Sequence, residues 1–251
     1  MFKVFSLCVI LLGLPGLQWG AYTPVIVDFT GNSVDVSSWP AVQAHLQQRN
    51  ISPDKVTFLT LHQCDLTQLP EWVAEKMPNL KHLRIERTPI TALPENIDRL
   101  TKLERILAPR NKITGLPSSF NRLIHLTEAD FSHNNLKNLS KSSFKLPKLT
   151  RLNLYANQIA TLPDLSSLVS LQRLFLSHNK DIRFEPHSKP LASLEILDLA
   201  YCNLKTVPSF FGDMSSLRRL NLTGNPLLEK GSGNKWGKKE LKQRFANKVR
   251  F

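Results

Sequence analysis

The chain has 251 residues, of which 41% are hydrophobic and 21% are charged, which excludes an intrinsically disordered chain and a membrane bundle. Its three cysteines are too few for a disulfide-dense scaffold. The net charge of +13 permits an acidic partner, such as nucleic acid, anionic lipid or an acidic protein, but does not require one. Leucine accounts for 42 residues, and such an excess in a soluble chain indicates internal repetition.

The first residues predict an export signal. Lys3 precedes an apolar run over residues 4–14, and Pro15 and Gly20 then supply small or helix-breaking residues near which a signal peptidase could cut. The run is shorter than the roughly 20 residues that cross a bilayer, and no later segment resembles a stop-transfer sequence. We therefore expect residues 1–21 to be a signal peptide that leaves a mature chain without a transmembrane segment. The alternative is an uncleaved apolar segment that anchors the protein or packs against it.

Residues 22–55 are expected to form an N-terminal cap. Ser38 is followed by tryptophan and proline, which indicates a helix start with Ser38 as the N-cap and the proline in the first turn. Apolar side chains then recur on one face of a helix over residues 39–49. An edge strand over residues 24–29 could precede this helix.

Eight similar units follow over residues 56–228 in steps of 22 to 24 residues. They begin at Val56, Leu80, Leu103, Leu126, Leu149, Leu171, Leu194 and Leu217. Each unit reads L-x-x-L-x-L-x-x-N-x-L, as in residues 149–159, and most continue into Leu-Pro. The L-x-L alternation turns the leucines to one face of a strand and the residues between them to the other face.

This pattern resembles the leucine-rich repeat family, specifically its 23-residue type with an L-P-x-x-I continuation. The resemblance implies an α/β fold, a horseshoe-shaped solenoid with a concave parallel β-sheet and with short helices or 3-10 turns on the convex side. Both ends of such a solenoid expose apolar core, so we expect a capping helix at each end.

A polar or small side chain occupies the ninth position of every unit. In a solenoid, an asparagine amide at this position can satisfy backbone groups of its own and the adjacent turn that would otherwise be buried unpaired. The two cysteines at this position lie six strands apart, about 29 Å at about 4.8 Å per strand, which is too far for a disulfide, so we expect buried and reduced thiols. The predicted structural ladder comprises Cys64, Thr88, Asn111, Asn134, Asn157, Asn179, Cys202 and Asn225.

Repeat six departs from the pattern. In the other units an apolar residue stands two positions after the ladder residue, whereas Ile182 stands three positions after Asn179. Leu-Pro is also absent from residues 183–190. We therefore expect an irregular loop on the outer side of the solenoid at this point.

Residues 229–251 are strongly basic, with eight lysine and arginine residues against two glutamates. Leu241, Phe245 and Val249 recur at four-residue steps, which predicts a capping helix, and a short strand is expected at the end of the chain. A polyanion or anionic-membrane contact is one interpretation of this charge. A solvated outer face of the cap is favoured instead, because no aromatic residues suited to stacking on bases interleave with the basic ones.

The side chains that project from a concave sheet follow from the repeat register. Among them are many arginine and aromatic residues, which are the types enriched at protein interfaces and hot spots. Glu128 and Asp130 interrupt them, which favours a mixed-charge protein surface over a uniform phosphate backbone as the partner. A solvated sheet face without a partner is the alternative. The predicted partner-binding residues are Arg84, Arg105, Arg151, Tyr155, Arg173, Phe175 and Tyr201.

Sequence motifs of catalysis are missing, including G-x-S-x-G, H-E-x-x-H, a phosphate-binding glycine loop and C-x-x-C. His62 and His82 could approach each other but lack a clear third metal ligand. We therefore expect no enzyme, no metal and no cofactor, but a monomeric module that binds a protein partner. The alternative is a binder of anionic lipid, glycan or nucleic acid that uses the basic surface and the C-terminal helix.

The flanking sequences bear on the compartment. Three N-x-S/T sequons occur, but the cysteine-rich caps of animal extracellular repeat proteins are missing, and the ending from Asn225 to Phe251 is similar to that of bacterial proteins with this repeat type. With the leader, these features favour an exported bacterial protein, periplasmic or extracellular, over an animal receptor fragment. Delivery to a host cell is one form of this hypothesis.

Overall fold

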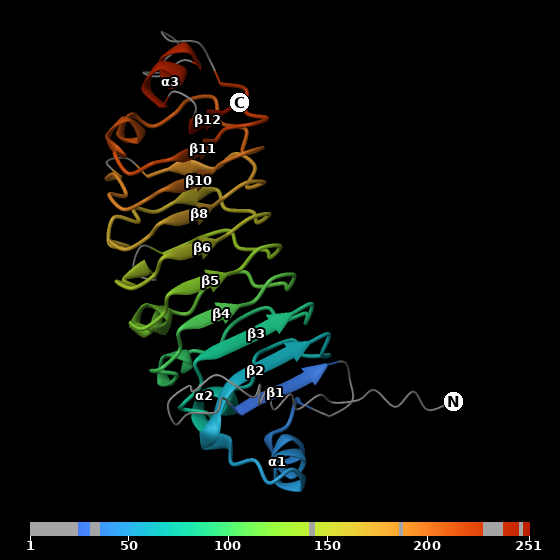
Figure 1. Ribbon diagram of the computed structural model, residues 1–251. Coiled ribbons are helices and arrows are strands. Elements are labelled where there is room, and N and C mark those ends of the chain that lie inside the picture. Colours follow the sequence, from blue (N-terminus) through green and yellow to red (C-terminus); the bar gives the residue numbers. More distant parts are fainter. Residues whose placement is uncertain (1–24, 31–35, 141–143, 186–187, 228–237, 246–247) are drawn as a thin grey trace, which may run out of the picture.

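A computed structural model describes residues 25–30, 36–140, 144–185, 188–227, 238–245 and 248–251. One strand from each repeat joins a single parallel sheet, so the repeats form a stack along the length of the molecule (Figure 1). The α/β repeat solenoid predicted from the sequence is therefore confirmed. The expected signal peptide lies outside the described residues. Within the described ranges, the helices are too short or too polar to cross a membrane.

The main sheet has ten strands, each parallel to its neighbours, and their spatial order follows the chain. The strands are β1 (Val25–Thr30), β2 (Val56–His62), β3 (His82–Glu86), β4 (Arg105–Leu107), β5 (Glu128–Asp130), β6 (Arg151–Asn153), β8 (Arg173–Phe175), β10 (Ile196–Asp198), β11 (Arg219–Asn221) and β12 (Val249–Arg250). A second, two-stranded sheet joins β7 (Thr161–Leu162) to β9 (Arg183–Phe184).

The segments between the sheet strands carry short helical pieces that return the chain to the start of the next strand. The α-helix α2 (Glu71–Lys76) serves the first repeat. In repeats two, three and seven a short 3-10 helix takes its place. These turns comprise Ile97–Arg99, Ser118–Arg122 and Ser209–Asp213, and another, Pro53–Lys55, leads into β2.

The strand register aligns equivalent positions of successive repeats side by side. The central apolar residue of each strand therefore lies directly beside that of the next, and none of these side chains is more than 2% exposed. The row comprises Leu59, Leu83, Ile106, Ala129, Leu152, Leu174, Leu197 and Leu220. Because each repeat buries its apolar face only against its neighbours, the core is continuous along the stack.

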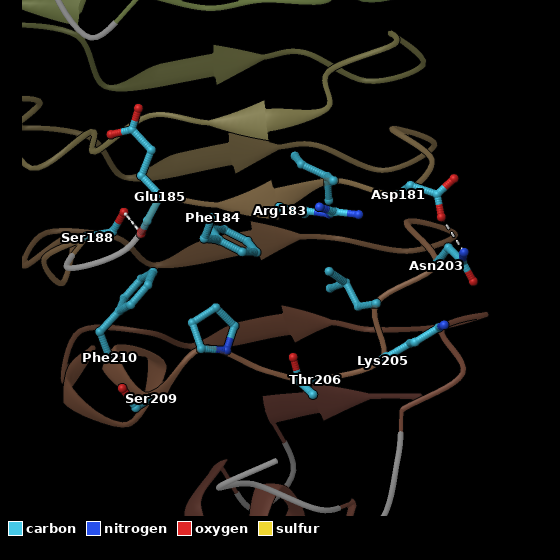
Figure 2. Close-up of a pocket in the computed structure, with 13 residues that line it drawn as sticks. Asp181, Arg183, Phe184, Glu185, Ser188, Asn203, Lys205, Thr206, Ser209 and Phe210 are labelled. Atoms are coloured by element: carbon cyan, nitrogen blue, oxygen red, sulfur yellow. Dashed lines mark hydrogen bonds between the residues drawn. The ribbon is translucent and has the colours of Figure 1, made fainter. Parts of the chain in front are cut away.

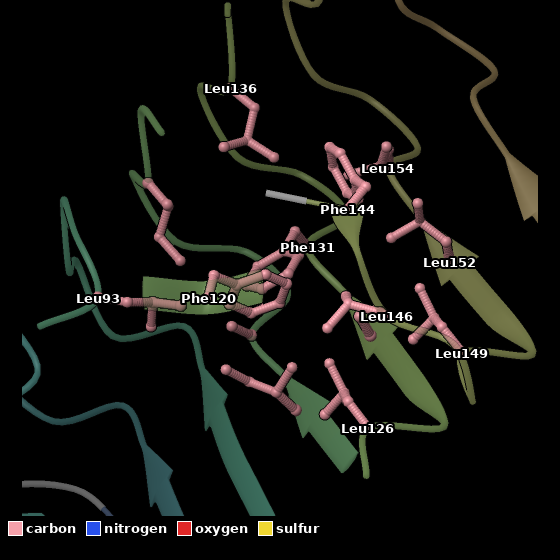
Figure 3. Close-up of a cluster of buried hydrophobic side chains, with 14 of the residues drawn as sticks. Leu93, Phe120, Leu126, Phe131, Leu136, Phe144, Leu146, Leu149, Leu152 and Leu154 are labelled. Atoms are coloured by element: carbon pink, nitrogen blue, oxygen red, sulfur yellow. The ribbon is translucent and has the colours of Figure 1, made fainter. Parts of the chain in front are cut away.

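Phenylalanines fill the core where the outer turns approach the sheet. Phe120, Phe131 and Phe144 are fully buried and lie among leucines of adjacent repeats (Figure 3). The rings of Phe120 and Phe131 meet edge to face, with centroids 5.7 Å apart. Contacts of this kind join the core of one repeat to that of the next.

Helices cap both ends of the stack. At the N-terminal end, α1 (Trp39–Gln48) buries Val42 and Leu46, and β1 pairs with the free edge of β2. Ser38 is the N-cap residue of α1, as predicted, although its side chain makes no capping hydrogen bond. The proline in the first turn has no N–H group to satisfy there.

At the C-terminal end, α3 (Lys238–Phe245) buries Leu241 and Phe245. Val249 does not continue the apolar face of this helix, as its spacing suggested. It lies in β12, beside Leu220 of β11. Pairing with β11 satisfies the backbone groups at the last edge of the sheet, which a longer helix would leave open.

Repeat six is more regular than expected. The predicted irregular loop over residues 183–190 is wrong at its start, because Arg183 and Phe184 form β9 and pair with β7. Asp181 adopts a left-handed backbone with φ 64°. This conformation absorbs the additional residue, so that the Arg183 N–H donates to the Ala160 carbonyl at 2.9 Å. Residues 186–187 lie outside the described ranges.

Candidate functional site

The asparagine ladder holds consecutive repeats together. Asn157 shows the pattern: its Nδ2 donates to the carbonyls of Phe131 at 2.9 Å and Leu154 at 3.0 Å, and its Oδ1 accepts from the Leu136 N–H at 3.0 Å. Each amide thus satisfies backbone groups of its own turn and of the preceding repeat. The same arrangement recurs in Asn111, Asn134, Asn179 and Asn225, all at most 8% exposed.

Three other side chains occupy ladder positions with fewer bonds. The Thr88 hydroxyl accepts from the Cys64 N–H at 3.3 Å, while the Cys64 thiol lies 3.5 Å from the Phe29 carbonyl. The Cys202 thiol donates to the Leu176 carbonyl at 3.3 Å. Both cysteines are buried and free, and burial raises the pKa of each thiol to about 11. All eight ladder side chains face the interior, where a partner cannot reach them.

The two ladder cysteines are expected to resist alkylation in the folded protein. With a thiol pKa of about 11, almost no thiolate forms at pH 8, and burial also excludes the reagent. We expect iodoacetamide to leave the Cys64 and Cys202 peptides unlabelled at pH 8 and to label both fully in denaturant, as read by peptide mass mapping. The raised pKa also predicts a loss of stability as the pH rises from 9 toward 11, because only the unfolded thiols then ionise. A disulfide between the two would contradict the solenoid itself.

The strand register defines a surface that we call the open sheet face. It consists of the two columns of side chains that flank the buried central row. The first column comprises Phe58, His82, Arg105, Glu128, Arg151, Arg173, Ile196 and Arg219, and the second comprises Thr60, Arg84, Leu107, Asp130, Asn153, Phe175, Asp198 and Asn221. Five of the predicted partner-binding residues lie in these columns, and Tyr155 and Tyr201 follow the strands at one end.

Two carboxylates, Glu86 and Glu128, form ion pairs with three of the four predicted arginines. Glu128 lies between Arg105, at 3.6 Å, and Arg151, at 3.3 Å. The Arg151 Nε–H is not aligned for a hydrogen bond, so this contact is an ion pair only. Arg84 contacts Glu86 at 2.5 Å, and this hydrogen bond holds the pKa of the Glu86 carboxyl below its ordinary value.

The remaining cations of the face lie toward its C-terminal end. Arg173 and Arg219 flank Ile196 in the first column, and both are exposed. Neither has an ion-pair partner among the described residues. Phe175 lies beside them, with the Arg151 guanidinium 5.0 Å from its ring centroid. Arg219 was not selected from the sequence, because ion pairing between neighbouring strands decides which arginines are free of a partner.

A row of aromatic rings borders the open sheet face, one ring per repeat from repeat four to repeat seven. Ring centroids are 5.0 Å apart from His133 to Tyr155, 5.2 Å from Tyr155 to His178 and 4.8 Å from His178 to Tyr201. We call these four residues the aromatic row. Tyr201 is 53% exposed. Burial lowers the pKa of His133, and the nearby Arg110 lowers it further.

Backbone geometry places His133, His178 and Tyr201 at the equivalent left-handed position after their strands, and Tyr155 stands one residue before that position in repeat five. The residue directly before the ladder residue has a left-handed backbone conformation in all eight repeats, with φ between 52° and 71°. Gly224, the last of the series, leaves room for the Tyr201 ring, which a Cβ at that position would strike. Sequence reasoning missed the two histidines, although their shared position in the repeat was the available signal. The series comprises Gln63, Arg87, Arg110, His133, Ala156, His178, Tyr201 and Gly224.

The histidines near the first strands do not assemble a metal site. His62 lies 3.9 Å from Glu86, and His82 stacks on Phe58 with ring centroids 5.2 Å apart. Across the described part of the chain, no group of three histidine, cysteine, aspartate or glutamate side chains could hold a metal ion.

Comparisons with known proteins agree with this architecture. Family models described as leucine-rich repeats match residues 124–180 and 193–214. Together with the repeat register, these matches show that the chain is a leucine-rich repeat protein. No curated protein sequence matches it. Among solved structures, it is similar to a leucine-rich repeat protein of Leptospira interrogans, with 22% identity and a TM-score of 0.47. That match covers 79% of this chain and 62% of the other, so this chain spans less than two thirds of that protein's length.

Proposed function

We propose that this protein is a non-enzymatic module that binds a protein partner on its open sheet face and aromatic row. Leucine-rich repeat domains generally mediate protein–protein interaction. The proposal rests on two features that occur together in the C-terminal half of the stack. Arg173 and Arg219, which have no ion-pair partner among the described residues, lie in repeats six and eight, and Tyr155, His178 and Tyr201 of the aromatic row lie in repeats five to seven. Arginine and tyrosine are the residues most enriched at binding hot spots.

The ion pairs of the arginines indicate which part of the face would bind an acidic partner most strongly. Arg84 and Arg105 already contact carboxylates, so an acidic group of a partner has to compete with Glu86 and Glu128. Arg173 and Arg219 meet no such competition. We therefore place the centre of the interface on repeats five to eight. The acidic side chains retained on the face favour a protein surface of mixed charge over a polyanion.

Charge reversal at this centre provides the test. We expect the double variant R173E/R219E to abolish binding of the partner that the wild-type protein captures, and Y201A to weaken it by about 2 kcal/mol or more. Capture followed by mass spectrometry identifies the partner, and isothermal titration calorimetry measures the affinity. All three side chains are exposed, so the melting temperature should not change.

A matched variant on the C-terminal cap separates the proposal from its alternative. Lys239 and Lys242 are exposed on α3 and belong to neither column of the open sheet face. K239E/K242E should leave partner binding intact. Binding that survives R173E/R219E, but fails in the cap variant and falls steeply with salt, would replace the proposal with polyanion binding.

A further inference from the structure

The turns that lead away from the sheet are joined by their own backbone ladder. The Lys112 N–H donates to the Ile90 carbonyl at 2.9 Å, and the Gln158 N–H donates to the Leu136 carbonyl at 3.0 Å. The series continues into repeat six, where the Glu185 N–H donates to the Leu162 carbonyl at 3.1 Å. Through repeats two to six, each outer turn is therefore hydrogen bonded to the one before it.

Between repeats six and seven this outer ladder is reduced to one bond, from the Asp181 N–H to the Cys202 carbonyl at 3.0 Å. Beyond that bond, no backbone hydrogen bond joins residues 182–185 to residues 203–208 among the described residues. Arg183 and Glu185 turn their N–H groups toward β7, so Phe184 between them directs its N–H and C=O groups toward repeat seven. The Leu204 N–H is already taken by the Asn225 side chain at 2.9 Å. β9 therefore has an open edge.

A pocket of about 700 Å³ occupies this gap, which we call the breach (Figure 2). Phe184 and Phe210 line one part of it, with ring centroids 6.0 Å apart. Arg183 and Lys205 line another part, and both are exposed. A hydrogen bond between the side chains of Asn203 and Asp181 closes one end.

The breach is lined by two carboxylates and two cations, but only the carboxylates are engaged by other groups of the protein. Asp181 is engaged by Asn203, and the Glu185 carboxylate accepts from the Asp164 N–H at 3.2 Å. Arg183 and Lys205 have no ion-pair partner within the described ranges. The breach therefore offers an apolar wall, two free cations and an unpaired strand edge.

We propose that the breach binds an extended acidic peptide, which adds as a strand to the open edge of β9. A peptide backbone supplies the alternating donor and acceptor that Phe184 presents, and strand addition to an exposed edge is a general mode of peptide recognition. An acidic side chain then meets Arg183 and Lys205, and an apolar one meets Phe184 and Phe210. This site shares no residue with the open sheet face or the aromatic row and does not depend on their function.

The test uses a fluorescein-labelled six-residue peptide of alternating valine and glutamate, with binding followed by fluorescence anisotropy. We expect saturable binding that R183E weakens at least tenfold. Lys137 occupies the equivalent position of repeat four and is also exposed, so K137E should bind the peptide like the wild-type protein. The Phe184 amide should gain hydrogen-exchange protection when the peptide is bound.

Two further peptides separate strand addition from simple charge attraction. A valine–lysine peptide should not bind. A valine–glutamate peptide with N-methyl groups on alternate residues keeps its charge but loses backbone donors, so it should bind at least tenfold more weakly. The proposal is overturned by equal affinity for the methylated peptide, by binding of the lysine peptide, or by no saturable binding at about 1 mM.

Discussion

Replacing Phe131 with alanine is expected to lower the free energy of unfolding by about 3–5 kcal/mol. The side chain is fully buried and packs edge to face on Phe120 of the preceding repeat. Its loss leaves a cavity that the neighbouring repeats cannot close, because the strand register and the ladder hold their backbones in place (Figure 3). Urea denaturation followed by circular dichroism measures the change.

An exposed apolar residue of the adjoining turn is the matched control. Ile124 is 52% exposed, so I124A should change the free energy of unfolding by no more than about 0.5 kcal/mol. F131L should fall between the two, since leucine refills part of the volume. A loss below about 1 kcal/mol for F131A would mean that repeats three to five do not share a continuous core.

The ladder variant N157A is expected to cost about 1–3 kcal/mol, although it removes no apolar contact of comparable size. The amide satisfies the Phe131 and Leu154 carbonyls and the Leu136 N–H. Without it the Leu136 N–H would remain buried without its acceptor, while the two carbonyls would each keep one bond, from Asn134 and Asn179. Thermal and urea unfolding should both report the loss. The adjacent Gln158 is exposed, so Q158A should have little effect. Wild-type stability in N157A would contradict the ladder.

The two stability variants and the binding variants act on different parts of each repeat. Phe131 and Asn157 lie in the interior, whereas Arg173, Arg219 and Tyr201 project from the surface. A solenoid separates these roles by alternation along the strand, since neighbouring side chains point to opposite faces. Changes in binding can therefore be measured without changes in folding, which makes the proposed interface open to direct test.

The sequence by itself determined the repeat register, and with it much of the fold. Leucine spacing within a strand is a local pattern, and the 22-to-24-residue step repeats it often enough to align every strand. The position of Asn157 and its equivalents in the interior follows from the same register. The two capping helices could also be predicted, because an end of the stack has to cover its apolar core.

Only the tertiary structure decided which of the aligned arginines have a carboxylate partner and which do not. Arg105 and Arg151 are equivalent to Arg173 in the repeat, yet Glu128 lies between the first two and not beside the third. Such pairing joins residues one repeat apart and depends on side-chain rotamers, which spacing alone does not specify. The same holds for the aromatic row, whose rings meet across successive turns.

The breach could be identified only from the structure. One additional residue in repeat six was visible in the sequence and predicted irregularity, but its consequence was not visible. Asp181 takes a left-handed conformation that restores the pairing of β9 to the repeat before it. Its own N–H donates to Cys202 of the repeat after it, but among the described residues β9 makes no backbone hydrogen bond to that repeat. The backbone of repeat six faces both repeat five and repeat seven. Which of the two it pairs with depends on the hydrogen bonds of the folded stack, which the sequence alone does not specify.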